Sequence, residues 1–191
     1  MVQRYIPFKD MTVREAEEDI ILEGYFAVFD SIYELWPGHT ESIAKGAFDG
    51  CMEQDVRALW NHNQDIVLGR TGAGTLTLEA DDKGLKGTIR INRQDQDAMN
   101  AAARVRRQDC SGCSFGFEIG EESADYREDG TVHWTITRIS KLYEVSPCVF
   151  PAYEETSINA RKKEVDDHNR RKLEVWRKEM RERLKGGRDG D

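Results

Sequence analysis

Residues 110–118 read Cys-Ser-Gly-Cys-Ser-Phe-Gly-Phe-Glu and mark a change from a helical pattern to a strand pattern. Residues 95–107 before them carry alanines, Met99 and Val105 at positions that predict an amphipathic helix. Small residues then surround Ser114, and alternating aromatic residues follow it. A serine between a helix end and a strand can expose its hydroxyl beside free backbone amides, as a serine hydrolase requires. Because ordinary turn serines share this position, the interpretation depends on partner residues elsewhere.

The rest of the chain predicts many short strands and few helices. Residues 20–29 are rich in β-branched and aromatic side chains, which indicates a long buried strand. Residues 75–80 and 85–91 flank a hairpin turn. Further short strands are predicted at 56–60, 66–70, 132–139 and 142–146. The pattern predicts an α+β fold with a mainly antiparallel, closed or nearly closed β-barrel and helices on its surface.

Composition divides the 191 residues into three parts. Residues 1–19 are polar and predict an N-terminal arm, and residues 20–160 predict one domain. Residues 161–191 hold 12 Lys or Arg and 8 Asp or Glu, a formal charge of +4, against −12 for the remainder. This segment predicts a charged C-terminal helix that ends in a disordered tail. Its narrow apolar stripe, typical of a helix that binds a partner, comprises Leu173, Trp176, Met180 and Leu184.

The composition also argues against several classes of protein. A formal net charge of −8 argues against general nucleic-acid binding. No apolar run approaches the ~20 residues of a membrane-spanning helix, so no membrane partner is predicted. The first residues lack the apolar core of a signal peptide, which predicts a cytoplasmic protein.

The four cysteines predict free, mostly buried thiols rather than a metal site. Cys110 and Cys113 form a C-x-x-C pair, but no second pair stands at zinc-ligand spacing. We therefore predict no metal and no cofactor. A cysteine- or zinc-dependent hydrolase built on these two cysteines is kept as an alternative, which bound metal or inactivation by thiol alkylation would reveal.

A serine nucleophile needs a base, and His62 is the best-placed histidine. It follows the predicted strand 56–60 and stands between two asparagines. A strand end fixes the position of the ring and leaves it accessible, as a general base requires. A polar strand cap is the structural alternative. His39 lies in a loop and His168 in the charged tail, positions that suit a base less well.

The third member of such a site should orient the imidazole and stabilise its charged form. Glu144 interrupts an otherwise apolar strand, where a carboxylate needs a hydrogen-bonded partner. His62 would be such a partner, and Arg138 is the structural alternative. His133 is a second candidate for the orienting role, with exposure to solvent as its alternative.

A series of short motifs occurs in order along residues 20–155. They are Gly-Tyr-Phe-Ala-Val-Phe-Asp at 24–30, Ile-Ala-Lys-Gly-Ala-Phe-Asp at 43–49, Leu-Trp-Asn-His-Asn at 59–63, Leu-Gly-Arg at 68–70, Asp-Lys-Gly-Leu at 82–85, Ser-Phe-Gly-Phe at 114–117, Glu-Val-Ser at 144–146 and Pro-Ala-Tyr at 151–153. No single motif is specific, but the ordered set resembles the prohead maturation proteases of tailed phages. These are serine endopeptidases related to the herpesvirus capsid-assembly proteases. The resemblance implies a herpesvirus-protease-like fold, with residues 20–160 as the protease domain.

The resemblance also implies a role for each residue of the site. Ser114 matches the nucleophile and His62 matches the base. Glu144 matches the acidic position before Val-Ser and is implied as the third member. His133 stays an alternative, because the herpesvirus relatives use a histidine in that role. Cys110 and Cys113 beside the nucleophile depart from the family pattern, and Cys113 is an alternative nucleophile that lies one residue from the matching position.

The implied function is that of a phage prohead maturation serine endopeptidase. Such an enzyme cleaves scaffold or scaffold-like segments of the capsid protein, and often itself, inside the immature capsid in the cytoplasm of the bacterial host. The reaction is acyl transfer to the serine and then to water. Backbone amides of residues 112–114, or of the turn at 104–107, are candidates for holding the oxyanion.

The implied partners are the major capsid protein and its scaffold segment. The herpesvirus relatives act as dimers, and whether this chain is a homo-oligomer stays open. On this interpretation residues 161–191 dock on the scaffold and are removable by self-cleavage. The alternative function is a non-catalytic capsid assembly or scaffolding protein with a partner-binding C-terminal helix, which predicts that Ser114 and His62 lie far apart.

Overall fold

The computed structural model describes residues 1–7, 11–16, 19–110, 112–150 and 155–186. The chain forms two compact units, Met1–Tyr153 and Glu154–Asp191. In its described residues the first unit combines two β-sheets with one α-helix and a short 3-10 helix, and the second contains a long α-helix. The fold is therefore mixed α+β, as the sequence predicts.

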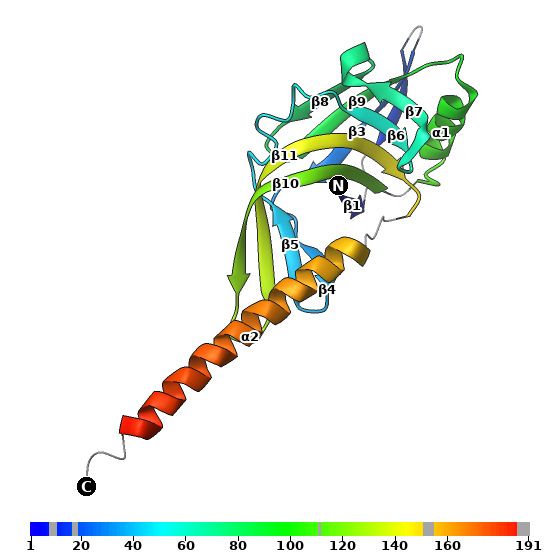
Figure 1. Cartoon of the computed structure of the whole chain (residues 1–191). Coiled ribbons are helices and arrows are strands. Elements are labelled where there is room, and N and C mark those ends of the chain that lie inside the picture. The colour runs from blue at the N-terminus through cyan, green and yellow to red at the C-terminus, as the bar shows by residue number, and fades with distance from the viewer. Residues whose placement is uncertain (8–10, 17–18, 111, 151–154, 187–191) are drawn as a thin grey trace. The chain divides into compact units, whose positions relative to one another are not determined.

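Seven strands of the described residues form the larger sheet: β1 (Val2–Pro7), β4 (Tyr33–Trp36), β5 (His39–Ile43), β6 (Arg57–Trp60), β7 (Asn63–Arg70), β10 (Gly112–Tyr126) and β11 (Val132–Cys148). The sheet is built around the long antiparallel pair of β10 and β11, which lie side by side in Figure 1. β1 pairs with the other edge of β10. The other edge of β11 pairs in parallel with β5 near its start and with β6 near its end. β4 then extends β5, and β7 extends β6.

The smaller sheet contains β2 (Thr12–Ala16), β3 (Asp19–Val28), β8 (Leu76–Ala80) and β9 (Gly84–Ile91). All of its pairs are antiparallel, in the order β2-β3-β9-β8. The pairing of β8 with β9 confirms the hairpin predicted from the alternating sequence. A short 3-10 helix, η1 (Thr71–Ala73), precedes β8.

The prediction of a closed or nearly closed β-barrel is wrong, because the strands form two separate sheets. Within the described residues, the larger sheet has unpaired edges at β1, β4 and β7, and the smaller at β2 and β8. The physical reason lies in β11, whose outer edge is divided between β5 and β6. The sheet therefore branches instead of continuing around a barrel. An alternating sequence predicts that a strand has one buried face, but not which strand lies beside it.

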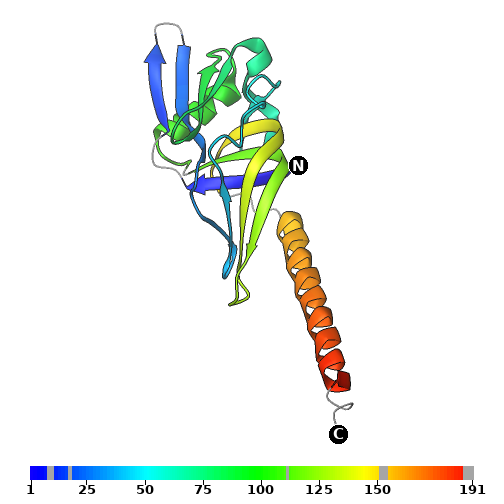
Figure 2. The same cartoon turned by 90° about the vertical axis from the view of Figure 1, so that its left-hand side faces the viewer.

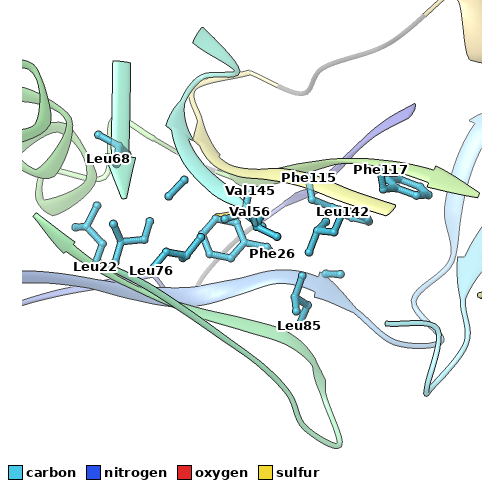
Figure 3. Close-up of a cluster of buried hydrophobic side chains, with 14 of the residues drawn as sticks. Leu22, Phe26, Val56, Leu68, Leu76, Leu85, Phe115, Phe117, Leu142 and Val145 are labelled. Atoms are coloured by element: carbon cyan, nitrogen blue, oxygen red, sulfur yellow. The ribbon is translucent and has the colours of Figure 1, made fainter. Parts of the chain in front are cut away.

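Side chains from both sheets meet in one core, and this core determines which side chains of β10 point inward. Figure 3 shows Phe26 and Leu85 of the smaller sheet in one cluster with Phe115 and Val145 of the larger. All four are fully shielded from solvent. Burying such a side chain is worth about 1.5–3 kcal/mol. Since side chains alternate along a strand, the burial of Phe115 in this core directs its neighbour Ser114 to the opposite face.

Helix α1 (Gln96–Arg106) precedes β10 and confirms the predicted helix. Asp95 caps its N-terminus by accepting hydrogen bonds from the backbone N–H groups of Asp97 and Ala98. The buried face of α1 consists largely of alanines. Gln108, just after the helix, adopts a left-handed conformation with φ of +64°, and the chain then enters β10.

The second unit contains α2 (Glu155–Gly186), drawn from orange to red in Figures 1 and 2. The helix begins before the boundary predicted at residue 161. Leu173 and Trp176 of the predicted apolar stripe are exposed. Among the described residues, no helix is both long enough and apolar enough to cross a membrane. The end of the predicted disordered tail, residues 187–191, lies outside the described residues.

Candidate active site

Ser114 lies near the start of β10, inside a ladder of three strands. It pairs with Tyr5 of β1 on one side and with Ser146 of β11 on the other, and it is fully buried. Figure 2 shows β1, the blue strand that begins at the label N, beside the green β10. Directly opposite residues of an antiparallel pair project from the same face, with Cβ atoms about 4.5–5.5 Å apart. Ser114 and Ser146 are therefore neighbours on one face of the sheet.

His62 lies in the turn between β6 and β7, where Asn61 and His62 have left-handed φ angles of +54° and +60°. Such a turn suits a β-hairpin, but the left-handed conformation costs a non-glycine residue about 1–2 kcal/mol. Asn61 fixes the turn to β11 by donating its N–H to the Pro147 carbonyl at 3.0 Å. Its side-chain oxygen accepts the N–H of Val149 at 3.2 Å. The N–H of His62 donates to Oγ of Ser146 at 3.3 Å.

Glu144 is buried on β11, and both of its carboxylate oxygens accept hydrogen bonds. Oε1 lies 2.8 Å from Nδ1 of His62, and Oε2 accepts the Ser146 hydroxyl at 2.5 Å. Because a carboxylate only accepts hydrogen bonds, Nδ1 carries a proton, and in the neutral form of the ring Nε2 is then the nitrogen with the free lone pair. The alternative partner named from the sequence, Arg138, instead binds Glu121 at 2.9 Å on the surface.

Two polar atoms of this cluster are buried without a hydrogen-bond partner in the described part of the chain: Nε2 of His62 and Oγ of Ser114. Leaving a buried polar atom unpaired costs about 1–3 kcal/mol, so such atoms call for an explanation. A serine hydrolase passes a proton between these two atoms. In this conformation they are not hydrogen-bonded to each other. The non-enzymatic interpretation predicts that the two residues lie far apart, whereas both are neighbours of Ser146.

A pocket of about 320 Å³ opens beside His62 and Glu144. Its wall combines apolar side chains with amides and one guanidinium, a mixture typical of sites that bind small ligands or single side chains. Residues at the start of the chain contribute to it as well as β6, β7 and β11. The remaining lining residues are Met1, Gln3, Arg57, Leu59, Gln64, Val67 and Tyr143.

His133 lies at the opposite end of β11, away from this cluster. Its Nδ1 lies 2.8 Å from the hydroxyl of Thr40, and its Nε2 lies 2.9 Å from the hydroxyl of Ser42. His39 also lies elsewhere, stacked on Trp36 with ring centroids 4.4 Å apart. The structure thus brings His62 and Glu144 into contact, and does not bring His133 to them.

The cysteines near Ser114 are buried thiols. Cys113 points into the core and is fully shielded, and this burial raises the pKa of its thiol well above the ordinary value. Burial also raises the pKa of Cys110 and of Cys148. Since the thiolate is the nucleophilic form, these thiols are poorly suited to attack a carbonyl. Within the described residues, no three His, Cys, Asp or Glu side chains are grouped so as to hold a metal ion.

Comparison with known proteins identifies the family. A family model described as caudovirus prohead serine protease matches residues 9–171. The chain belongs to this family. The prohead protease of Enterobacteria phage HK97 is 26% identical over 160 residues, which cover 82% of this chain and 66% of that protein. The chain therefore spans just under two thirds of the length of that relative. No solved structure matches this chain.

The family match confirms the resemblance to prohead proteases seen in the ordered motifs. It does not test the predicted likeness to herpesvirus proteases, which stays a prediction. It also assigns no residue of this chain to a catalytic role, so the roles of Ser114, His62 and Glu144 rest on their geometry and on the motifs that contain them.

The sequence named several backbone amides as candidates to hold the oxyanion. In this conformation these amides already lie within hydrogen-bonded helix or sheet. In the segment 104–107, Arg107 donates its N–H to the carbonyl of Ala103 at 3.1 Å, and residues 104–106 lie in α1, where each N–H bonds to a carbonyl one turn earlier. Residues 112–114 lie in β10 with β1 on one side and β11 on the other. A donor to the oxyanion from either segment therefore requires a change of conformation.

Two further residues complete the cluster around His62 and Glu144. Neither of them was assigned a role from the sequence. Ser146 contacts both His62 and Glu144. At Gly116, which lies opposite Glu144 in the ladder, an added Cβ would stand 2.7 Å from Oε1 of Glu144 and 2.9 Å from Sδ of Met1. The glycine thus leaves room for the carboxylate. A glycine inside a strand pattern is a signal for such close approach.

Proposed function

We propose that this protein is a serine endopeptidase of prohead maturation, with Ser114 as nucleophile, His62 as general base and Glu144 as the group that orients His62. One observation carries the proposal: a buried carboxylate binds Nδ1 of His62 and leaves Nε2 unpartnered, on the face where the buried Ser114 hydroxyl is also unpartnered. Membership of the prohead serine protease family supports the same reaction.

In the first step, Oγ of Ser114 attacks the carbonyl carbon of a peptide bond and passes its proton to Nε2 of His62. A bond forms between Oγ and carbon, and the carbonyl electron pair moves to the oxygen. The imidazole becomes a cation, which the carboxylate of Glu144 stabilises from the other side of the ring. A movement of the serine or histidine side chain must first bring Oγ and Nε2 into hydrogen-bond distance.

In the second step, the protonated His62 gives its proton to the leaving amine, and the peptide bond breaks. The acyl group then remains on Ser114 as an ester. His62 next removes a proton from water, whose oxygen attacks the ester and releases the new carboxyl end. The serine recovers its proton from the imidazole, so the cycle consumes only water.

The proposed substrate is the scaffold or scaffold-like segment of the major capsid protein, cut inside the immature capsid in the bacterial host. The name of the HK97 relative, prohead protease, supports this place of action. We keep two finer proposals. The first is that α2 docks on the scaffold and is removable by self-cleavage, for which mass spectrometry of the active protein tests whether the tail is lost. The second is that the fold is like that of herpesvirus capsid-assembly proteases, which a crystal structure would test.

The deciding experiment replaces Ser114 by alanine in a chain co-expressed with its capsid protein. We expect capsid protein cleavage to stop while shells still assemble, because the substitution removes the nucleophile and leaves the core face of β10 unchanged. The matched control is Ser140→Ala, an exposed serine of β11 whose hydroxyl donates to the carbonyl of Glu118 at 3.2 Å. Continued cleavage by Ser114→Ala, seen on a gel of the purified shells, would place the nucleophile elsewhere.

A further inference from the structure

Ser146 occupies a central position in the cluster although it does not line the pocket. It is fully buried on β11 and stands opposite Ser114 in the ladder. Its hydroxyl is engaged by the carboxylate of Glu144 and by the backbone N–H of His62. Its effect on the reaction must therefore pass through its neighbours.

One hydroxyl group joins the histidine to the carboxylate. Oγ of Ser146 accepts the backbone N–H of His62 at 3.3 Å and donates its proton to Oε2 of Glu144 at 2.5 Å. Oε1 of Glu144 accepts the ring proton of His62 at 2.8 Å. These three hydrogen bonds close a ring through His62, Ser146 and Glu144. The ring holds the histidine at two points, its backbone and its imidazole.

The Glu144 carboxylate and the turn that carries His62 both need a further hydrogen bond to hold them in place. The terminal torsion of a glutamate has broad, roughly two-fold preferences, so a single hydrogen bond leaves the carboxylate free to swing. The turn that carries His62 has a strained left-handed backbone, which persists only where the surroundings enforce it. The Ser146 hydroxyl restricts the carboxylate and the turn together.

We infer that Ser146 is a positioning residue, which aims Nε2 of His62 at Ser114 by fixing Glu144 and the His62 backbone at once. The inference rests on the proposed function, because it assigns Ser146 to the same proton transfer. Within the described residues, the Ser146 hydroxyl forms no hydrogen bond to Oγ of Ser114 or to Nε2 of His62. Without its hydroxyl, Glu144 loses the donor to Oε2 and His62 loses the acceptor of its N–H.

The test compares Ser146→Ala with Ser42→Ala in the full chain. Ser42 is a matched control, because it is also a buried serine whose hydroxyl contacts a histidine, His133, at 2.9 Å. The substrate is a synthetic peptide spanning a capsid protein cleavage site mapped with the wild-type enzyme. The readouts are kcat, KM, thermal unfolding and the NMR resonance of the His62 Nδ1 proton, assigned by its loss in His62→Gln.

We expect Ser146→Ala to lower kcat by roughly 10²-fold, the scale of a small misplacement of a catalytic group, with little change in KM. The His62 Nδ1 resonance should shift, and Ser146→Thr, which keeps a hydroxyl, should recover most of kcat. Ser42→Ala should change neither kcat nor the resonance, even if both alanine variants unfold at lower temperature.

Two outcomes would overturn the inference. One is a kcat for Ser146→Ala no lower than that of Ser42→Ala, and the other is a lower kcat with an unchanged His62 resonance, which marks a merely structural serine. If Ser146→Ala does not fold, Ser146→Cys, of similar size and with a weaker donor, is measured by the same readouts. Failure of the proposed function is distinguishable, since Ser114→Ala would then still cleave the peptide.

Discussion

Each end of β11 has a histidine, His62 in contact with Glu144 at one end and His133 within the strand at the other, and the two are bound in different ways. At the end that contains Glu144, the carboxylate binds one nitrogen of His62 and leaves the other without a partner in the described chain. At the end that contains His133, hydroxyls of Thr40 and Ser42 engage both ring nitrogens. A ring with both nitrogens occupied has no position free to accept a proton from a nucleophile.

The partners differ in charge as well as in number. A carboxylate stabilises an imidazolium ion, and hydrogen bonds to ionised groups are roughly twice as strong as neutral ones. Hydroxyls such as those of Thr40 and Ser42 offer no charge. The environment of each ring, rather than the presence of a histidine on or near the strand, therefore separates the candidate base from a structural residue.

The largest expected effect is a loss of activity in His62→Gln. It tests the comparison directly when His133→Gln is measured with the same synthetic peptide. We expect His62→Gln to lower kcat roughly 10⁴- to 10⁶-fold, as loss of a general base does in serine proteases. His133→Gln should keep nearly full activity and lose about 1 kcal/mol of folding stability through weakened hydrogen bonds. Equal losses of activity in the two variants, with both folded by circular dichroism, would break the comparison.

An intermediate effect is expected from Gly116→Ala, which sharpens the account of the Glu144 end. The added Cβ would stand 2.7 Å from Oε1 of Glu144, the oxygen that binds His62, so this carboxylate must shift from its position. We expect kcat to fall by roughly 10²-fold, the scale of a misplaced catalytic group. Steady-state kinetics with the peptide measure the effect.

The matched control is Gly120→Ala, on the same strand beyond the site. There the added Cβ meets the guanidinium of Arg138 at 3.0 Å and the backbone of Ser140 at 3.1 Å, so it disturbs no residue of the cluster. We expect lower thermal stability with unchanged kcat. If Gly116→Ala were as active as Gly120→Ala, the space beside Glu144 would not matter for the reaction.

The smallest effect concerns the thiols that accompany the Glu144 end and have no counterpart beside His133. Burial raises the pKa of Cys113, Cys110 and Cys148, so the thiolate fraction near neutral pH is lower than for an exposed cysteine and rises only at higher pH. We expect iodoacetamide near neutral pH to leave activity almost unchanged and to label these residues only after denaturation. Rapid inactivation with label on Cys113 would favour the cysteine hydrolase instead.

Local patterns carried much of the fold. The apolar spacing of residues 95–107 predicts α1, and alternation around Asp81–Gly84 predicts the pairing of β8 with β9. Barrel closure was wrong because it depends on which strands are neighbours. Nothing in a single strand's sequence shows that β11 divides its edge between β5 and β6.

The candidate site, like the fold, could be predicted only in part from the sequence. Glu144 was noticeable because an isolated carboxylate in an apolar strand requires a partner, and the structure supplies His62. The choice between Glu144 and His133 could not be made from position, since the sequence predicted two strands at 132–139 and 142–146 and did not show that one continuous strand, β11, holds the two residues at opposite ends. Ser146 carried no signal of its own, because a serine in a buried strand is ordinary until its hydroxyl is seen between two other groups.

The pairing of β1 with β10 has a consequence for the order in which the chain folds. Strand β1 pairs with Gly112–Phe117, far along the chain, and His62 finds its carboxylate only in β11. Contacts between such distant parts of a chain form late, because a long loop must close first. A nascent chain that has been made as far as β10, but not yet β11, therefore carries Ser114 without an oriented histidine. The carboxylate that orients the histidine thus comes from a strand made after the one that carries the serine, so the three residues meet only once β11 has paired.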